Sequence, residues 1–307
     1  MLGWALALWT GALLGASQID LSPAAWIALA PLAIACHGRT WRRAAGLGFA
    51  AGVVAGSALY GLLPYGAFLY LVICFYCGLN MALFGGVLAA LSGPCPRWFR
   101  VVLPALLWTS LEYGRRYGFV SFPIMLGPTQ VDLLPLWQVA AYTGGHGLSF
   151  LVALPAGLFF AWAVDRRPPW RAGLIVAACL GATWALGTAR MSSPLPPGPS
   201  VQVAGIQPAL QNWLFRVAPV SRRHDREVVG PLMAKTRQAL TDGAKLIVWP
   251  ETVIQTPTLG RRSLGLELRA LADDHGATIV VGGVRLGADD QLHNSAKYRM
   301  PTSCLTN

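Results

Sequence analysis

The sequence is poor in charged residues. Charged side chains make up 12% of the 307 residues, about half the share in ordinary soluble domains, and hydrophobic ones make up 54%. The shortage is greatest in residues 1–200, which hold 11 arginines, four acids and no lysine. Residues 201–307 hold 13 basic and nine acidic residues. These proportions exclude a single soluble globule and a disordered chain, and they predict a membrane segment followed by a water-soluble segment.

Cysteine is also too scarce for a disulfide-framed secreted domain. Five of the six cysteines lie in or beside the apolar half, and Cys74 and Cys77 form a C-x-x-C inside an apolar run without a partner histidine or carboxylate. Because zinc needs four convergent ligands, we expect small packing residues here, with no metal and no cofactor. The sequence also lacks the internal repeat that marks many transporters.

Seven apolar runs approach or exceed the length that crosses a bilayer. They cover about residues 2–16, 19–36, 44–63, 66–93, 101–117, 135–164 and 172–190. Between them lie arginine clusters at 39–43, 97–100 and 166–171. Because positively charged loops stay in the cytoplasm, these clusters predict a cytoplasmic N-terminus. The N-terminus lacks the positively charged start of a signal peptide, so we expect the first apolar run to be retained and not cleaved. The arginine clusters also account for most of the net charge of +11, so we expect no nucleic-acid partner.

The predicted domains are a membrane domain at 1–190, a Pro-rich linker at 191–200 and an α/β domain at 201–307. Within the last domain, β-rich runs alternate with helical patterns. The strands are expected at 201–207, 245–249 and 277–283, and the helices at about 221–241 and 262–275. This order favours a sheet with right-handed crossovers. The near-continuous apolar run at 245–249 is typical of a strand buried on both faces.

Glu251 directly follows the middle strand, after Trp249 and Pro250. The carboxyl ends of strands in α/β sheets are where functional sites collect. If Trp249 shields this carboxylate from water, Glu251 can serve as a general base near neutral pH. The alternative is a solvated glutamate that caps the next turn.

Three charged or titratable residues in the membrane half are further candidates. Glu112 and Arg115 are i, i+3 neighbours that can pair on one helix face, either as a functional site or as a pair at the membrane interface. His146 lies among glycines and can mark a close helix contact. Trp26 is one of several aromatic residues near predicted span ends, where we expect interfacial positions.

Several motifs, in order along the chain, resemble the apolipoprotein N-acyltransferases of the carbon–nitrogen hydrolase (nitrilase) superfamily. In the membrane half these are L-L-W-T-S-L-E-Y-G-R-R at 106–116, P-T-Q at 128–130 and G-G-H-G-L-S-F at 144–150. In the second half they are V-Q-V-A-G-I-Q-P at 201–208, L-I-V-W-P-E-T at 246–252, and V-V-G-G at 280–283 followed by H-N-S-A at 293–296.

The resemblance implies an α-helical membrane domain followed by an incomplete α-β-β-α sandwich, in the bacterial inner membrane with residues 200–307 on the periplasmic side. It implies acyl transfer from a phospholipid to the N-terminal cysteine of a diacyl lipoprotein, through a thioester on a Glu-Lys-Cys triad. Glu251 matches the general base. The residues that match its supporting positions are Gln207, Trp249, Pro250 and Asn294. The candidates for substrate access are Glu112, Arg115, Gln130 and His146.

The lysine and cysteine of that triad have no matching position in the sequence. Lys297 stands too early, and Cys304 lacks the strand-to-turn setting of a nucleophile. We therefore expect a C-terminally shortened relative with impaired activity, in which half a sandwich leaves an open sheet edge and an uncovered apolar face. Two alternatives stay open: a non-catalytic membrane component of a plasmid conjugal-transfer system, which contains similar proteins, and a small transporter. The oligomeric state is not set by the sequence.

Overall fold

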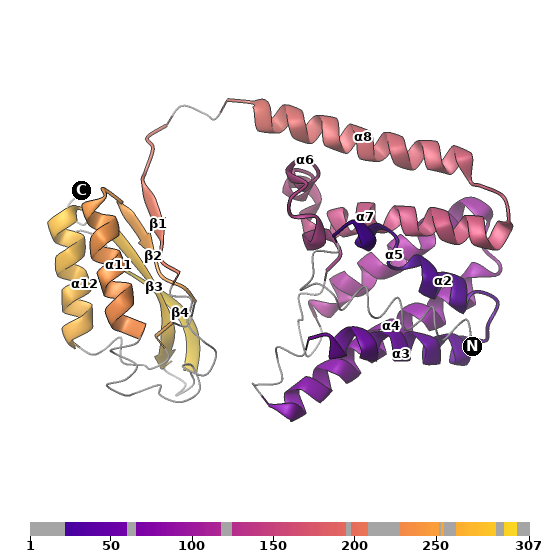
Figure 1. Cartoon of the computed structure of the whole chain (residues 1–307), viewed down its shortest axis with the longest axis horizontal. Helices are drawn as coiled ribbons and strands as arrows, with labels where there is room; N and C mark the ends of the chain where they lie inside the picture. The colour runs from indigo at the N-terminus through magenta and orange to yellow at the C-terminus, as the bar shows by residue number, and fades with distance from the viewer. Residues whose placement is uncertain are drawn as a thin grey trace. The chain divides into compact units, whose positions relative to one another are not determined.

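The computed structural model describes residues 22–59, 66–117, 125–194, 198–207, 228–251, 253–254, 262–286 and 292–299. By its internal contacts the chain divides into two compact units, Met1–Leu195 and Pro196–Asn307. The first unit is helical and the second contains a small sheet with two helices (Figure 1).

The described part of the first unit is built from helices of unequal length. In chain order they are η1 (Ser22–Trp26), α2 (Ala30–Cys36), α3 (Trp41–Ser57), α4 (Ala67–Ser92), α5 (Arg97–Arg115), η3 (Gly127–Gln130), α6 (Leu134–Trp137), α7 (Ala140–Asp165) and α8 (Trp170–Ser192). Among the described residues, α4, α7 and α8 are long and apolar enough to cross a membrane. The predicted run at 2–16 lies outside the described residues, and the count of seven spans stays a prediction.

The prediction of one continuous span at 135–164 is wrong. Two helices occupy this stretch, the short α6 and the long α7, and α7 is itself interrupted at Gly144, which has φ 66° and ψ −177°. Glycine has no Cβ and adopts this left-handed region at little cost. The hydropathy of the run gives no sign of the break, because glycine and proline interrupt it without adding charge.

Helices α3 and α4 pack with their backbones in close approach. Every fourth residue of α3 on this side is a glycine, at positions 48, 52 and 56. A Cβ added at Gly52 would lie 2.7 Å from the Cα of Gly78, and one at Gly56 would lie 2.6 Å from the Cα of Cys74. Small residues at this spacing let membrane helices approach closely. Cys74 of the C-x-x-C is a buried packing residue at this contact.

Helix α8 has few contacts with the rest of its unit. Its buried residues are Val176 and Gly187, and most of its other side chains are exposed. Gly187 is the point of closest approach, because a Cβ there would lie 3.0 Å from the Cα of Pro135 at the start of α6.

The helical unit has two chemically different ends. At the first, which we call the arginine end, lie the arginine clusters at 39–43, 97–100 and 166–171, at or beside the starts of α3, α5 and α8. The ends of α2 and α4 are joined there by His37 and Ser92, and α5 is joined to α7 by Arg100 and Asp165. At the opposite end, which we call the exit end, α8 finishes beside the start of α7, where Arg190 donates a hydrogen bond of 3.2 Å to the hydroxyl of Tyr142.

The second unit contains a four-stranded sheet in the order β1-β2-β3-β4. Its elements in chain order are β1 (Val203–Gly205), α11 (Gly230–Thr241), β2 (Leu246–Val248), α12 (Arg262–His275), β3 (Thr278–Leu286) and β4 (Leu292–Arg299). Strands β1, β2 and β3 are parallel, and β4 is antiparallel to β3. The sequence pattern does not predict β4, because its polar residues lack a continuous apolar run or a clear alternation.

One face of this sheet packs on α11 and α12. Ile247, Ile279 and Val281 are buried there with Leu232 and Leu268 of the two helices. On the opposite face, among the described residues, Val203 is 55% exposed and Val248 is 37% exposed. The expectation that residues 245–249 are buried on both faces is therefore wrong for this structure. The run is apolar throughout, but no second layer of the described chain covers its outer face.

Candidate functional sites

The carboxylate of Glu112 is buried near the end of α5, and its side chain has no exposed surface. Its Oε1 accepts hydrogen bonds from the indole Nε1 of Trp108, one helical turn earlier, and from the backbone N–H of Leu126 at 2.8 Å. A buried carboxylate is costly unless such donors satisfy it. Glu112 therefore joins α5 to the turn that precedes η3.

The second oxygen of Glu112 faces a histidine of another helix. Glu112 Oε2 lies 3.8 Å from Nδ1 of His146 on α7, and within the described chain neither atom has a hydrogen-bond partner. The His146 ring packs edge-on against Tyr113 with 5.5 Å between ring centroids. The separation is too long for a direct hydrogen bond, so the two buried polar atoms face each other without one.

The turn between residues 126 and 130 is tied to α7 by a second buried polar contact. The backbone N–H of Gly127 donates to the hydroxyl of Ser149 at 2.8 Å, and Ser149 is fully buried. A Cβ at Gly127 would lie 2.9 Å from the carbonyl oxygen of Gly145. Only glycine lets the turn approach α7 so closely without a shift of the backbone.

Gln130 connects this turn to the beginning of the described chain. Its side-chain amide donates to the carbonyl oxygen of Ser22 at 2.6 Å and accepts from the indole of Trp26 at 2.8 Å. The backbone carbonyl oxygen of Gln130 accepts a hydrogen bond from the indole of Trp137 at 2.8 Å. Trp26, which the sequence placed at the membrane interface, thus has a specific hydrogen bond inside the unit.

The predicted access residues therefore gather at the exit end. Glu112 and His146 face each other, and Gln130 follows the turn that Glu112 holds. Arg115 is buried like Glu112, with its guanidinium 5.5 Å from the ring centroid of Trp108, so the pair is not exposed at the surface of the unit. Sequence reasoning missed Trp108 and Ser149. The i, i+4 spacing of Trp108 and Glu112 was the available signal.

Glu112→Ala is expected to destabilise the helical unit because Trp108 Nε1 and the Leu126 N–H would lose their buried acceptor. Each unsatisfied donor costs about 1–3 kcal/mol. Glu112→Gln keeps one acceptor oxygen and should lose less. Thermal unfolding of the purified chain in detergent would measure both, with Asp132→Ala as the control because Asp132 is an exposed acid of the same unit. Equal stability of Glu112→Ala and the unchanged chain would contradict this role.

In the second unit, the parallel strands β1, β2 and β3 bring their carboxyl ends to one edge of the sheet. Gln207 follows β1 by two residues, and Glu251 follows β2 by three. The backbone of Ile254 bridges Gly283 of β3. Asn294 lies on β4 opposite Val284, also at this edge. The topology thus collects three of the predicted residues at the place where α/β sheets build their sites.

Glu251 itself is exposed. Trp249 does not shield it, because Trp249 is buried among the apolar core residues and donates from Nε1 to the hydroxyl of Thr236 on α11 at 2.8 Å. Trp249 instead anchors the strand end from which Pro250 and Glu251 project.

Glycine on β3 allows the chain to turn at this point. A Cβ at Gly282 would lie 2.8 Å from the Cα of Glu251. The backbone N–H of Trp249 donates to the carbonyl oxygen of Val280 at 2.9 Å, so β2 stays in register up to the turn. Gly282, the first glycine of V-V-G-G, therefore has a local reason, which is to leave room for the Pro250–Glu251 backbone.

Lys297 lies within β4, paired with Val281 of β3. Cys304 lies outside the described residues. Over the residues that the structure describes, no group of three or more histidine, cysteine, aspartate or glutamate side chains could hold a metal ion.

Comparison with known proteins covers both units. Residues 10–158 match the family model of the apolipoprotein N-acyltransferase N-terminal domain. An apolipoprotein N-acyltransferase of Geobacter metallireducens is 31% identical over 313 residues, which cover 93% of this chain and 58% of that protein. One of Shewanella oneidensis is 30% identical over 163 residues, covering 52% of this chain and 29% of that protein. The chain thus spans 58% of the length of the Geobacter protein and a smaller share of the Shewanella protein.

Proposed function

This chain belongs to the apolipoprotein N-acyltransferase family, and from that premise we propose that it carries the membrane domain and the general base of a phospholipid-dependent acyltransferase. The acceptor is the N-terminal amine of a lipoprotein cysteine. The observation that carries the proposal is the position of Glu251 at the carboxyl edge of the parallel strands, with Gln207 and Asn294 at the same edge.

The chemistry proposed for Glu251 is proton transfer. In the Glu-Lys-Cys triad that the family resemblance implies, the glutamate takes the proton of the cysteine thiol, and the thiolate attacks the ester carbonyl of the phospholipid. The lysine stabilises the oxyanion. The lysophospholipid leaves, and the lipoprotein amine then attacks the thioester, which releases the thiol. Glu251 is the member of this triad that the 307 residues supply.

The helical unit contributes substrate access in this proposal. The α8 helix leads into the second unit from the exit end, where Glu112 and His146 lie. Because the two facing atoms are buried, Glu112 and His146 contribute by positioning α5 against α7 at this end. The arginine clusters lie at the other end. For a protein of the inner membrane, this supports an orientation with the arginine end on the cytoplasmic side and the second unit on the extracytoplasmic side.

The proposal is tested with the purified chain in vesicles of phosphatidylethanolamine. The vesicles receive a diacylated lipopeptide with a free N-terminal cysteine, and mass spectrometry measures the mass of one added acyl chain. Because the lysine and cysteine of the triad have no match in these 307 residues, we expect N-acylated peptide only when the chain carries a C-terminal extension that supplies both, and then only in the presence of the phospholipid. An acetyl-capped lipopeptide, which has no free amine, is the control and should stay unmodified.

A second candidate is a non-catalytic membrane protein that binds a lipid-anchored partner. The exposure of Glu251 and of the outer face at Val203 and Val248 favours it, because an active base and a sandwich core are usually covered. Retention of the lipopeptide by the extended chain, without any acylation in the same vesicles, would favour this candidate over the first.

A further inference from the structure

The arginine end concentrates positive charge. Eight of the unit's arginines lie in its three loops, and the acid there is Asp165. The other acids of the unit's described residues, Glu112 and Asp132, lie on α5 and beside η3 at the exit end. The imbalance at the arginine end is therefore not offset by nearby carboxylates within the described chain.

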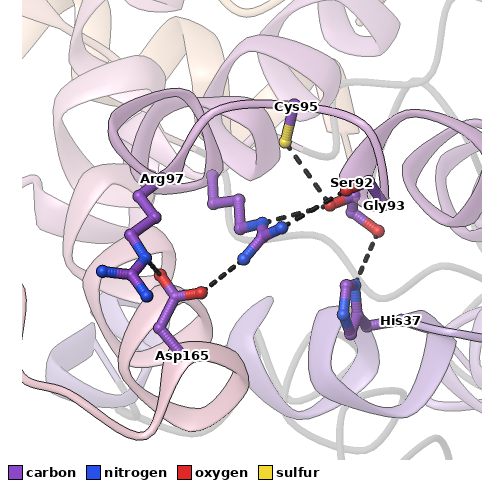
Figure 2. A network of polar contacts seen from close by, with 7 residues as sticks. His37, Ser92, Gly93, Cys95, Arg97 and Asp165 are labelled. Atoms are coloured by element: carbon purple, nitrogen blue, oxygen red, sulfur yellow. Dashed lines mark hydrogen bonds and ion pairs between the residues drawn. The ribbon is translucent and has the colours of Figure 1, made fainter.

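Asp165 is already paired with arginines of this end, and Figure 2 shows it beside Arg97 in the polar network that also holds Ser92 and His37. Arg100, largely buried, pairs with Asp165 Oδ1 and also donates to the carbonyl oxygens of Ser92 at 3.1 Å and Gly93 at 3.3 Å. The Nε of Arg97 lies 3.8 Å from Asp165 Oδ2. One carboxylate thus serves two arginines, and the network locks the ends of α4, α5 and α7 together.

His37 extends this network without adding charge near neutral pH. Its Nδ1 lies 2.9 Å from the hydroxyl of Ser92. Burial, and then the nearby Arg100 cation, lower the pKa of His37 below its usual value, with Asp165 acting in the opposite direction. The surplus charge of this end therefore comes from arginines, most of which are exposed and take no part in the network.

Tryptophans place those arginines at a defined depth. Trp41, Trp98 and Trp170 are each more than half exposed, and each is adjacent in sequence to an arginine. The guanidinium of Arg42 lies 5.5 Å from the ring centroid of Trp41, and that of Arg171 lies 5.0 Å from the ring centroid of Trp170. Exposed indoles settle at the headgroup level of a bilayer. The arginines beside them would then lie at the level of the lipid phosphates.

We propose that the arginine end is a binding surface for the headgroups of anionic phospholipids. Arg42, Arg43, Arg97, Arg166, Arg167 and Arg171 are exposed and present planar donor forks, which match phosphate oxygens better than a lysine ammonium does. Clusters of four to eight basic residues beside a membrane span attract anionic lipids in this way. The proposal is independent of the acyl transfer proposed above, because it concerns the opposite end of the helical unit.

Native mass spectrometry of the full chain in detergent tests this surface. The chain is mixed with phosphatidylglycerol, with phosphatidylcholine of the same acyl chains, or with inorganic phosphate. We expect phosphatidylglycerol adducts in excess over phosphatidylcholine adducts and no displacement by phosphate. Joint replacement Arg42→Gln, Arg43→Gln and Arg171→Gln should lower the affinity for phosphatidylglycerol by about fivefold for each arginine removed.

Two further variants separate headgroup binding from a loss of fold. Arg116→Gln with Arg190→Gln removes two exposed arginines of the exit end and should retain the lipid. Lysines at positions 42, 43 and 171 keep the charge and should show an intermediate affinity. Equal adducts with both lipids, displacement of phosphatidylglycerol by inorganic phosphate, or unchanged affinity in the glutamine variant would each overturn the proposal.

Discussion

Replacement of Gly52 by leucine is expected to force α3 away from α4 and to destabilise the helical unit by about 3 kcal/mol or more. A Cβ at Gly52 already falls within 2.7 Å of the Cα of Gly78, and its nearest neighbours are backbone atoms that cannot move aside as a side chain can. Unfolding of the purified chain in mixed detergent micelles would measure the loss. We expect the variant to unfold at a lower fraction of denaturing detergent than the unchanged chain.

The same helix provides a matched control. Gly46 lies on the exposed side of α3, and a Cβ there would meet no atom within 4 Å. Gly46→Leu makes the same chemical change in the same helix and should unfold close to the unchanged chain. Similar losses for both variants would mean that leucine disturbs α3 itself, and the close contact with α4 would not be the cause.

In the chain extended to supply the lysine and cysteine, Glu251→Gln is expected to lower the rate of acyl transfer to the lipopeptide by about 10²- to 10⁴-fold. The amide has nearly the shape of the carboxylate but does not accept a proton from a thiol near neutral pH. The measurement is the initial rate of N-acylation in phosphatidylethanolamine vesicles. Because Glu251 is exposed at a sheet edge, we expect the variant to fold like the unchanged chain, which circular dichroism would check.

Glu267→Gln is the control for this result. Glu267 is an exposed glutamate of α12 in the same unit, and it pairs with Arg237 of α11 on the helical side of the sheet. Its replacement should leave the rate unchanged. Equal rates for Glu251→Gln and the unchanged chain would exclude Glu251 as the general base and leave the family assignment intact.

Most of the described secondary structure follows from local sequence patterns. Helix α12 and strands β2 and β3 lie where apolar periodicity predicted them, because their buried faces require apolar residues at regular spacing. The break at Gly144 and the strand β4 were not predicted. Gly144 interrupts a run whose hydropathy is uniform, and β4 is held by its pairing with β3 more than by apolar burial.

In the candidate sites too, features set by adjacent residues could be predicted, whereas contacts between distant segments could not. The position of Glu251 after β2 could be predicted, since it depends on adjacent residues. The exposure of Glu251 could not be predicted, since the apolar sequence of β2 does not reveal how many faces of that strand are covered. The approach of His146 to Glu112 joins residues on two helices, α7 and α5, and no spacing along the chain predicts it. Nor does the sequence reveal that Gln130 accepts a hydrogen bond from Trp26.

The exposure of α8 has a consequence for how its sequence can vary. We expect bilayer lipid to solvate most of this helix as water solvates a surface helix of a soluble protein, so exchanges among leucine, isoleucine, valine and phenylalanine should be nearly neutral along it. Gly187 is the exception, because its missing side chain lets α8 lie against Pro135. The apolar positions of α8 are thus tolerant of exchange among apolar residues, whereas Gly187 is not.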